Sequence, residues 1–305
     1  MNKFIPIFQR WFRLWLGCLA IVSTAHAEII VPDDAGRTLT LASPARRIVS
    51  LAPNVTELLY AAGAGNFVVG AVAYSDYPEA AKTIPRVGSG AGLDIEAIVA
   101  LHPDLVIAWQ SGNPSWQVER LIALGMPVFE TEPRHLDDLA DLLERLGRLA
   151  GTEAIAGKTA ADFRRYLARL RARYSGRPVV PAFYQILDSS LLTVSRRHLL
   201  NDVIQLCGGR NVYADLPGLT PRVDVESVVQ RNPEVILASG YDALWQEWRD
   251  RWRALPMLTA SMRDNLFFIP PDLIERQSLR ILDGSAQICT ALEQARAKRK
   301  VPGNR

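Results

Sequence analysis

Apolar and amphipathic segments alternate along the chain from Arg47 onward. The short apolar segments, in which strands are expected, are residues 48–51, 67–72, 104–108 and 127–130. The amphipathic segments, in which helices are expected, are residues 56–62, 94–100, 115–124 and 136–149. Asn54 is a candidate N-cap for the first of these helices. Strands that alternate with helices are typical of a parallel sheet covered by helices, so we predict an α/β fold.

The pattern changes between Thr152 and Tyr174. Apolar residues recur there at helical spacing, the opposite face is rich in arginine, and neither Gly nor Pro interrupts the segment after Lys158. This spacing predicts one long helix. A solvated helix face explains the arginines better than nucleic-acid binding does. The alternation resumes with a predicted strand over residues 179–186, so we expect the helix to join two α/β lobes.

An internal repeat supports this division into lobes. Residues 94–108 match residues 224–238 without a gap, at a constant offset of 130 positions. Each copy contains a leading aspartate, an amphipathic helix, an x-Pro-acid turn and an apolar strand. The period is far longer than that of a solenoid repeat, so duplication of a lobe is the simplest explanation.

Glu96 and Glu226 occupy the same position in the two copies, in the first turn of each predicted helix. Two explanations are open from the repeat alone. The glutamates complement the helix dipoles beside the capping Asp94 and Asp224. Alternatively, they form a pair of surface carboxylates, one on each lobe, that binds arginines of a two-fold partner.

The first 27 residues have the features of a secretory signal peptide. Three basic residues precede an apolar run over residues 14–22, and the small residues of Ala25-His26-Ala27 place the predicted cleavage between Ala27 and Glu28. An uncleaved anchor and a lipoprotein modified at Cys18 are the alternatives. The net charge of +3 equals those three basic residues, so the secreted chain is formally neutral. Its total charge therefore gives no argument for binding nucleic acid.

Cleavage would leave two cysteines, Cys207 and Cys289, in an oxidising compartment. We predict a disulfide between them, with two buried free thiols as the alternative. The cysteines are 82 positions apart, and closing a loop of that length stabilises a fold by about 4 kcal/mol in the chain-entropy model.

Sequence signatures of enzymes are scarce. The chain has no Gly-x-Ser-x-Gly motif and no phosphate-binding P-loop, and His102, His135 and His198 are too far apart for a zinc motif. We therefore predict no catalytic residue, no metal ligand and no cofactor. Aromatic residues instead follow predicted strands at Tyr74 and Trp109, where α/β lobes bind ligands.

Flat aromatic side chains suit a large planar ligand. Core packing is the alternative explanation for each of them. We favour core packing for Phe183 and for the stripe formed by Trp245, Trp248 and Trp252.

Three segments carry a resemblance to a known family. They are Tyr74-Ser75-Asp76-Tyr77-Pro78, residues 98–109 and Cys207-Gly208-Gly209-Arg210-Asn211. They resemble the periplasmic cobalamin-binding proteins of vitamin importers, which belong to the helical-backbone class of ABC-transporter solute-binding proteins. The likeness extends from about residue 47 to residue 292.

The resemblance implies an α/β fold with two Rossmann-like lobes joined by a single long backbone helix. The expected parts are a signal peptide (1–27), an N-terminal lobe (28–150), a bridging helix (151–176) and a C-terminal lobe (177–305). It implies a periplasmic, non-enzymatic receptor that is monomeric when free. The receptor would hold a corrinoid, cobalamin, in the cleft as a transported ligand and deliver it to an ABC permease with its ATPase subunits.

The resemblance also assigns roles to residues. Ligand contacts fall on Tyr74, Trp109, Asp272, Leu273, Ile274, Glu275 and Arg276. Glu96 and Glu226 match two glutamates that bind permease arginines, and Cys207 and Cys289 match the family disulfide.

The chain also departs from the family, because Gly90, Leu192 and Thr220 stand where the family has aromatic residues. A heme or ferric-siderophore receptor of the same fold is therefore an alternative, and a periplasmic hydrolase is a more distant one.

Overall fold

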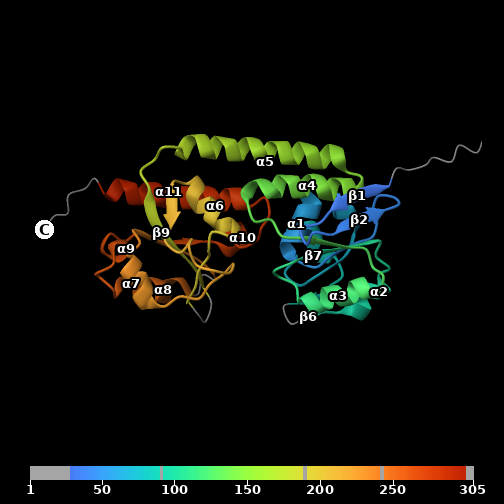
Figure 1. Cartoon of the computed structure of the whole chain (residues 1–305), viewed down its shortest axis with the longest axis horizontal. Coiled ribbons are helices and arrows are strands. Elements are labelled where there is room, and N and C mark those ends of the chain that lie inside the picture. The colour runs from blue at the N-terminus through green and yellow to red at the C-terminus, as the bar shows by residue number, and fades with distance from the viewer. Residues whose placement is uncertain (1–27, 90–91, 188–190, 241–243, 300–305) are drawn as a thin grey trace, which may run out of the picture.

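Two α/β lobes lie side by side beneath the long helix α5 (Glu153–Tyr174) in the computed structural model (Figure 1). The structure describes residues 28–89, 92–187, 191–240 and 244–299. This arrangement confirms the predicted α/β fold with two lobes and one long connecting helix. The predicted signal peptide, residues 1–27, lies outside the described residues.

The N lobe is built on a four-stranded parallel sheet with the order β4-β3-β7-β8. These strands are β3 (Ile48–Ser50), β4 (Val68–Ala71), β7 (Leu105–Trp109) and β8 (Val128–Thr131). Helices α1 (Pro53–Ala61) and α4 (Leu136–Ala150) cover one face, and α2 (Ile95–Ala100) and α3 (Ser115–Ala123) cover the other. Smaller elements complete the lobe: β1 (Ile29–Pro32), β2 (Thr38–Leu41), η2 (Gly65–Phe67), η3 (Glu79–Thr83), β5 (Gly88–Ser89) and β6 (Gly92–Leu93).

The C lobe repeats this plan. Its parallel strands, in the order β11-β9-β12-β13, are β11 (Gly209–Asn211), β9 (Val180–Leu187), β12 (Val235–Ser239) and β13 (Leu266–Ile269). In both lobes the parallel strand that comes first in the sequence thus lies between the second and the third. The remaining elements are β10 (Leu191–Leu192), α6 (Leu199–Leu206), α7 (Val225–Arg231), α8 (Trp245–Arg253), α9 (Thr259–Met262), α10 (Pro271–Ile274) and α11 (Ile281–Lys298).

The sequence repeat has the same structure in both lobes. Its two copies form α2 with β7 and α7 with β12. Asp94 accepts a hydrogen bond from the backbone N–H of Ala97 (2.9 Å), and Asp224 accepts one from Ser227 (2.7 Å). Both aspartates are therefore N-caps, as expected from their position before each helix.

The start of α1 differs from the prediction. The helix begins at Pro53, with Ala52 in the cap position and no capping side chain, so the assignment of Asn54 as N-cap is wrong. Proline fixes its backbone φ near the helical value and lacks the N–H that a first helical turn leaves unpaired. It therefore starts this helix without a polar cap.

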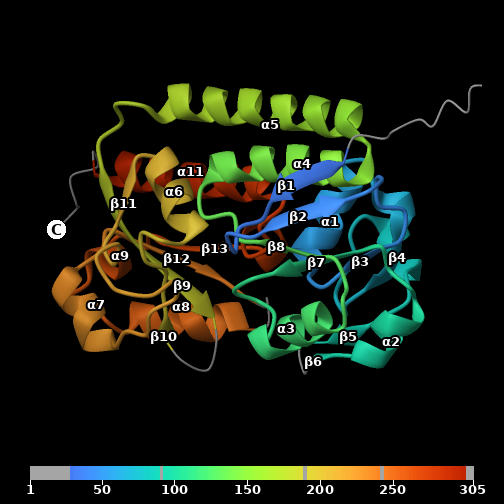
Figure 2. The same ribbon diagram turned by 45° about the vertical axis from the view of Figure 1, so that its right-hand side comes forward.

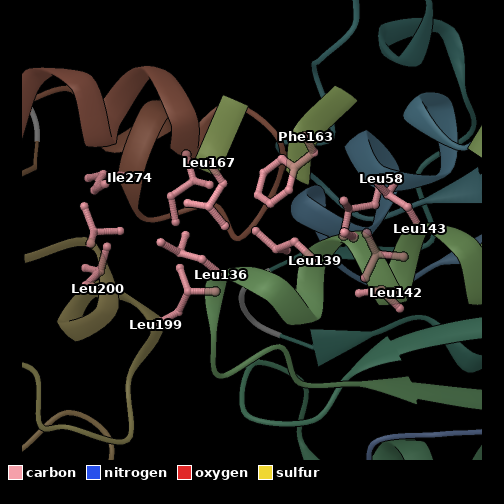
Figure 3. Packing of buried hydrophobic residues seen from close by; sticks show 14 of the residues in the cluster. Leu58, Leu136, Leu139, Leu142, Leu143, Phe163, Leu167, Leu199, Leu200 and Ile274 are labelled. Carbon is pink, nitrogen blue, oxygen red and sulfur yellow. The ribbon is translucent and has the colours of Figure 1, made fainter. Parts of the chain in front are cut away.

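One hydrophobic core runs through both lobes on the side of α5. It joins Leu58 of α1, Leu139 of α4, Phe163 of α5, Leu200 of α6 and Ile274 of α10, each at most 3% exposed (Figure 3). Figure 2 shows α4 and α11 as the layer directly under α5. The lobes are therefore joined by a continuous packed layer as well as by the helix.

The opposite faces of the two sheets have separate cores of different composition. Under α2 and α3 the buried apolar side chains of the described residues are all aliphatic. Under α7 and α8 they include Phe183, whose ring meets those of Tyr213 (5.5 Å) and Trp252 (5.8 Å) edge to face. Trp248 and Trp252 donate their indole N–H groups to Gln185 Oε1, at 2.7 and 3.0 Å. This confirms core packing for Phe183, Trp248 and Trp252.

The predicted disulfide between Cys207 and Cys289 is present, with their Cα atoms 4.6 Å apart. Cys207 directly follows α6 and Cys289 lies within α11. The bond therefore fastens together the two helices that cover one face of the C-lobe sheet. Both residues are fully buried.

Candidate ligand-binding cleft

Tyr74 follows β4 and stands in an unusual conformation. Its φ is +65°, and its side chain is 71% exposed. A bulky residue rarely adopts the left-handed region, and such strain concentrates at functional sites. The next residue fixes this turn, because the buried Ser75 hydroxyl lies 3.0 Å from the Thr56 hydroxyl of α1, which donates to it.

A first pocket, of about 450 Å³, opens beside Tyr74 in the N lobe. Trp109, at the carboxyl end of β7, lines this pocket together with the residues that follow β3 and β4. Asn113 ties two of these loops together, because its side chain accepts from the Trp109 backbone N–H (2.7 Å) and donates to the Leu51 carbonyl (2.8 Å). Every described residue that lines this pocket is uncharged.

A glycine positions the Trp109 indole. A Cβ on Gly112 would lie 2.0 Å from this ring, so only glycine lets the loop approach the indole face. The indole N–H is buried and has no hydrogen-bond partner among the described residues.

A second pocket, of about 400 Å³, lies where the two lobes meet. It shares Pro53 and Tyr74 with the first pocket, so the two adjoin. Four of the other described lining residues are charged, namely Asp76, Asp272, Glu275 and Arg276, and the remaining two are Gly240 and Pro271. The cleft thus combines an uncharged N-lobe wall with a charged junction between the lobes.

Hydroxyl groups from two C-lobe strands form a hydrogen-bonded chain to the Glu275 carboxylate. The Ser239 hydroxyl at the end of β12 donates to the Glu275 carboxylate, and it lies 2.5 Å from the Tyr184 hydroxyl of β9. Desolvation in the cleft raises the pKa of Glu275, although the hydrogen bond from Ser239 opposes the rise. The pKa of the fully buried Tyr184 is raised as well, first by burial and then by the nearby Glu275.

Arg276 belongs to an ionic cluster that crosses between the lobes. Its guanidinium contacts Glu57 (3.0 Å) and Asp76 (2.7 Å) of the N lobe and Asp272 (3.1 Å) of the neighbouring α10. Glu57, with only 3% of its side chain exposed, also accepts from Arg280 (2.5 Å). Burial alone would lower the pKa of Arg276, but its hydrogen bonds to Asp76 and Glu57 outweigh that effect and raise it.

The structure therefore gathers most of the predicted ligand residues around one cleft: Tyr74, Trp109, Asp272, Glu275 and Arg276. The expectation that Ile274 faces the ligand is wrong. Its side chain is 1% exposed and packs in the core shared by the lobes, because α10 turns that face inward (Figure 3). Leu273 is half-buried and lines neither pocket, and its role stays a prediction.

Sequence reasoning missed Glu57. The only signal is a carboxylate within a predicted amphipathic helix, which usually marks a solvated face. Of the three positions that depart from the family, Leu192 and Thr220 line neither pocket, and Gly90 lies outside the described residues.

Glu96 and Glu226 lie in the first turns of α2 and α7, far from α5 (Figure 1). Both residues are exposed. Within the described ranges neither glutamate forms a salt bridge, so each carboxylate is available to a partner.

No group of three or more His, Cys, Asp or Glu side chains in the described ranges is placed to hold a metal ion. No helix in those ranges has the length and apolar character needed to cross a membrane.

The profile of the family described as "Periplasmic binding protein" matches residues 48–261. The chain belongs to this family. This periplasmic binding protein is 34% identical over 267 residues to the vitamin B12-binding protein of Vibrio parahaemolyticus, a match that covers 86% of this chain and 95% of the relative.

Solved structures of periplasmic binding proteins agree with this membership. The crystal structure of the periplasmic vitamin B12 binding protein BtuF of Vibrio cholerae has a TM-score of 0.75 and 35% identity, covering 83% of this chain and 98% of that one. The periplasmic heme-binding protein RhuT from Roseiflexus has a TM-score of 0.71 and 24% identity, covering 82% and 98%. At that identity the second likeness shows the fold alone.

Proposed function

We propose that this protein is a periplasmic receptor that captures a corrinoid, cobalamin, between its lobes and delivers it to an ABC permease. The observation that carries the proposal is Tyr74, a strained and exposed aromatic residue shared by two adjoining pockets. The flat corrin ring suits the uncharged wall that contains Trp109. Its carboxamide side chains suit Asp272, Glu275 and Arg276, which offer both acceptors and donors.

The proposal extends to the rest of the importer. The segment 1–27 directs secretion and is removed after Ala27, the mature receptor is a monomer without enzymatic activity, and the permease acts with its ATPase subunits. Glu96 and Glu226 bind permease arginines, one from each lobe. Support for this role comes from their equivalent positions in the repeat and from the unpaired state of both carboxylates within the described residues.

Cobalamin is favoured over heme by the relatives. Vitamin B12-binding proteins are 34–39% identical to this chain, whereas RhuT is 24% identical. A heme receptor of the same fold therefore remains the second candidate, with Tyr74 as the side chain that would approach the iron.

The test is a titration of the mature chain with cyanocobalamin, heme and a ferric hydroxamate, followed by calorimetry and visible absorption. We expect one-to-one binding of cyanocobalamin. Tyr74→Ala should weaken that binding by about tenfold or more, as loss of an aromatic contact at a binding surface does. Tyr166→Ala, an exposed tyrosine of α5, is the matched control and should leave affinity unchanged. A heme spectrum without any cobalamin heat would refute the corrinoid assignment.

A further inference from the structure

An apolar groove lies on the N lobe between α2 and α3, away from the cleft. Its volume is about 890 Å³, roughly twice that of either cleft pocket. Figure 1 shows α2 and α3 together at the edge of the lobe farthest from α5. Glu96, the proposed docking glutamate, is one of the residues that line the groove.

The groove exposes large apolar side chains from both helices. Trp116 is 67% exposed, Leu124 46% and Val99 40%. The other face of α3 is buried in the lobe through Val118 and Leu121, so the outward side chains add nothing to the core. Contiguous exposed apolar surface marks an interaction site, and tryptophan is the residue type that most often dominates the binding energy of such sites.

The charged residues around the groove indicate the chemistry of the partner that it binds. Glu96 and Glu119 lie beside the apolar side chains, with Arg120 as the single basic neighbour. In the part of the chain that the structure describes, none of the three forms a salt bridge. The rim therefore complements a partner segment that carries an apolar side chain next to an arginine or a lysine.

The C lobe differs at the equivalent place. Glu226 of α7 matches Glu96, but two of the three tryptophans of the following helix are buried, Trp248 at 3% and Trp252 at 1% exposure, and the third, Trp245, is partly buried and stacks on Trp248. The exposed Met257 and Met262 belong to the α8–α9 region, which meets the carboxyl end of α7, whereas Glu226 is in its first turn. The pairing of an exposed tryptophan with a docking glutamate is thus found on the N lobe.

We propose that the α2–α3 groove is part of the permease-binding surface, where it receives an apolar side chain of the permease beside the basic residue that contacts Glu96. This inference rests on the proposed docking role of Glu96. It makes the two lobes unequal in the complex: the N lobe binds through an apolar anchor and an ion pair, and the C lobe binds through Glu226 without that anchor.

The experiment measures binding of the cobalamin-loaded receptor to its cognate permease–ATPase complex in nanodiscs. Trp116→Ala should weaken this binding by about tenfold or more, and Trp116→Phe should recover most of the loss. Tyr166→Ala, on α5 at the opposite side of the molecule, is the control and should change nothing (Figure 1). Cyanocobalamin affinity should stay unchanged in all three variants.

Charge reversal separates the two proposals. If Glu96→Arg weakens permease binding and Trp116→Ala does not, the groove proposal is overturned while the docking role stands. If Glu96→Arg and Glu226→Arg both leave permease binding intact, the docking role itself is wrong. Equal losses from Trp116→Ala and Tyr166→Ala would also overturn the groove proposal, because they would show an effect unrelated to this surface.

Discussion

The N and C lobes share a strand order and a sequence repeat but keep their aromatic side chains in different places. In the C lobe, Phe183, Trp248 and Trp252 form the core under α7 and α8. In the N lobe the corresponding core is aliphatic, while Tyr74 and Trp116 are on the surface. Duplication therefore preserved the backbone plan and left each lobe free to use large side chains differently.

The cleft shows a second difference between the lobes. The N-lobe pocket is lined by uncharged residues, including Trp109. The C lobe contributes Asp272, Glu275 and Arg276 to the junction. The N lobe thus supplies the flat apolar contact surface and Asp76 at the junction, whereas the C lobe supplies the other charged lining residues and has an aromatic core. Three pairs of substitutions test this division.

The largest effect is expected from a matched pair of tryptophans. Trp252→Ala should lower the free energy of unfolding by about 4 kcal/mol, because it empties a fully buried site and leaves Gln185 with one donor fewer. Trp116→Ala should lower it by less than about 0.5 kcal/mol, because that side chain is 67% exposed. Urea unfolding measures both, and similar losses would contradict the division of aromatic residues between core and surface.

A smaller loss is expected where the lobes are joined. Glu57→Gln removes the charge that faces Arg276 and Arg280, so it should cost about 3 kcal/mol of stability. The control is Glu144→Gln, whose partner Arg164 and own side chain are both at least 40% exposed, and it should cost no more than about 1 kcal/mol. If the two variants unfold alike, the ionic cluster does not hold the lobes together.

The smallest effect is a difference in pH dependence between the two sides of the cleft. Desolvation raises the pKa of Glu275, so the folded protein loses stability as pH rises from the ordinary value near 4.5 to the raised pKa. Burial also disfavours the charged form of Asp76, but hydrogen bonding and charge attraction to Arg276 outweigh this and lower its pKa. Stability from Asp76 is therefore present above its ordinary value near 3.8 and lost as pH falls through the lowered pKa.

Replacing either carboxyl group with an amide should show that the two groups change stability in opposite directions as pH rises. Relative to the unsubstituted protein, Glu275→Gln should gain stability as pH rises, and Asp76→Asn should lose it. Thermal unfolding over about pH 3 to 7 measures both trends. Parallel trends for the two variants would show that the two sides of the cleft do not differ electrostatically in this way.

Local patterns were enough to predict the four strands of the N-lobe sheet, the long helix and the repeat, because alternating hydrophobicity and aspartate caps act within a few residues of each other. The continuous core was not predictable in this way. Leu58, Phe163 and Leu200 are far apart in sequence, and only the packing of α1, α5 and α6 brings them together. Ile274 illustrates the consequence, because a residue within a predicted ligand-binding loop became part of that core.

The cleft was predicted in part for the same reason. Tyr74 and Trp109 follow strands, and the carboxyl ends of parallel strands form a common edge, so their proximity follows from topology. Glu57 contacts residues more than 200 positions away, and no short-range signal reports such a contact. The positive φ of Tyr74 is likewise set by the surrounding structure, here through Ser75 and Thr56.

The core shared by the lobes has a consequence for how a loaded receptor differs from an empty one. A protein that must first close around its ligand has its affinity reduced by the fraction of molecules that are closed before the ligand binds. Here the packed layer under α5 already fixes the spacing of the lobes, so ligand binding carries little of that cost. We therefore expect the permease to meet nearly the same outline in both states. We expect the permease to recognise the loaded receptor by the ligand at the opening of the cleft.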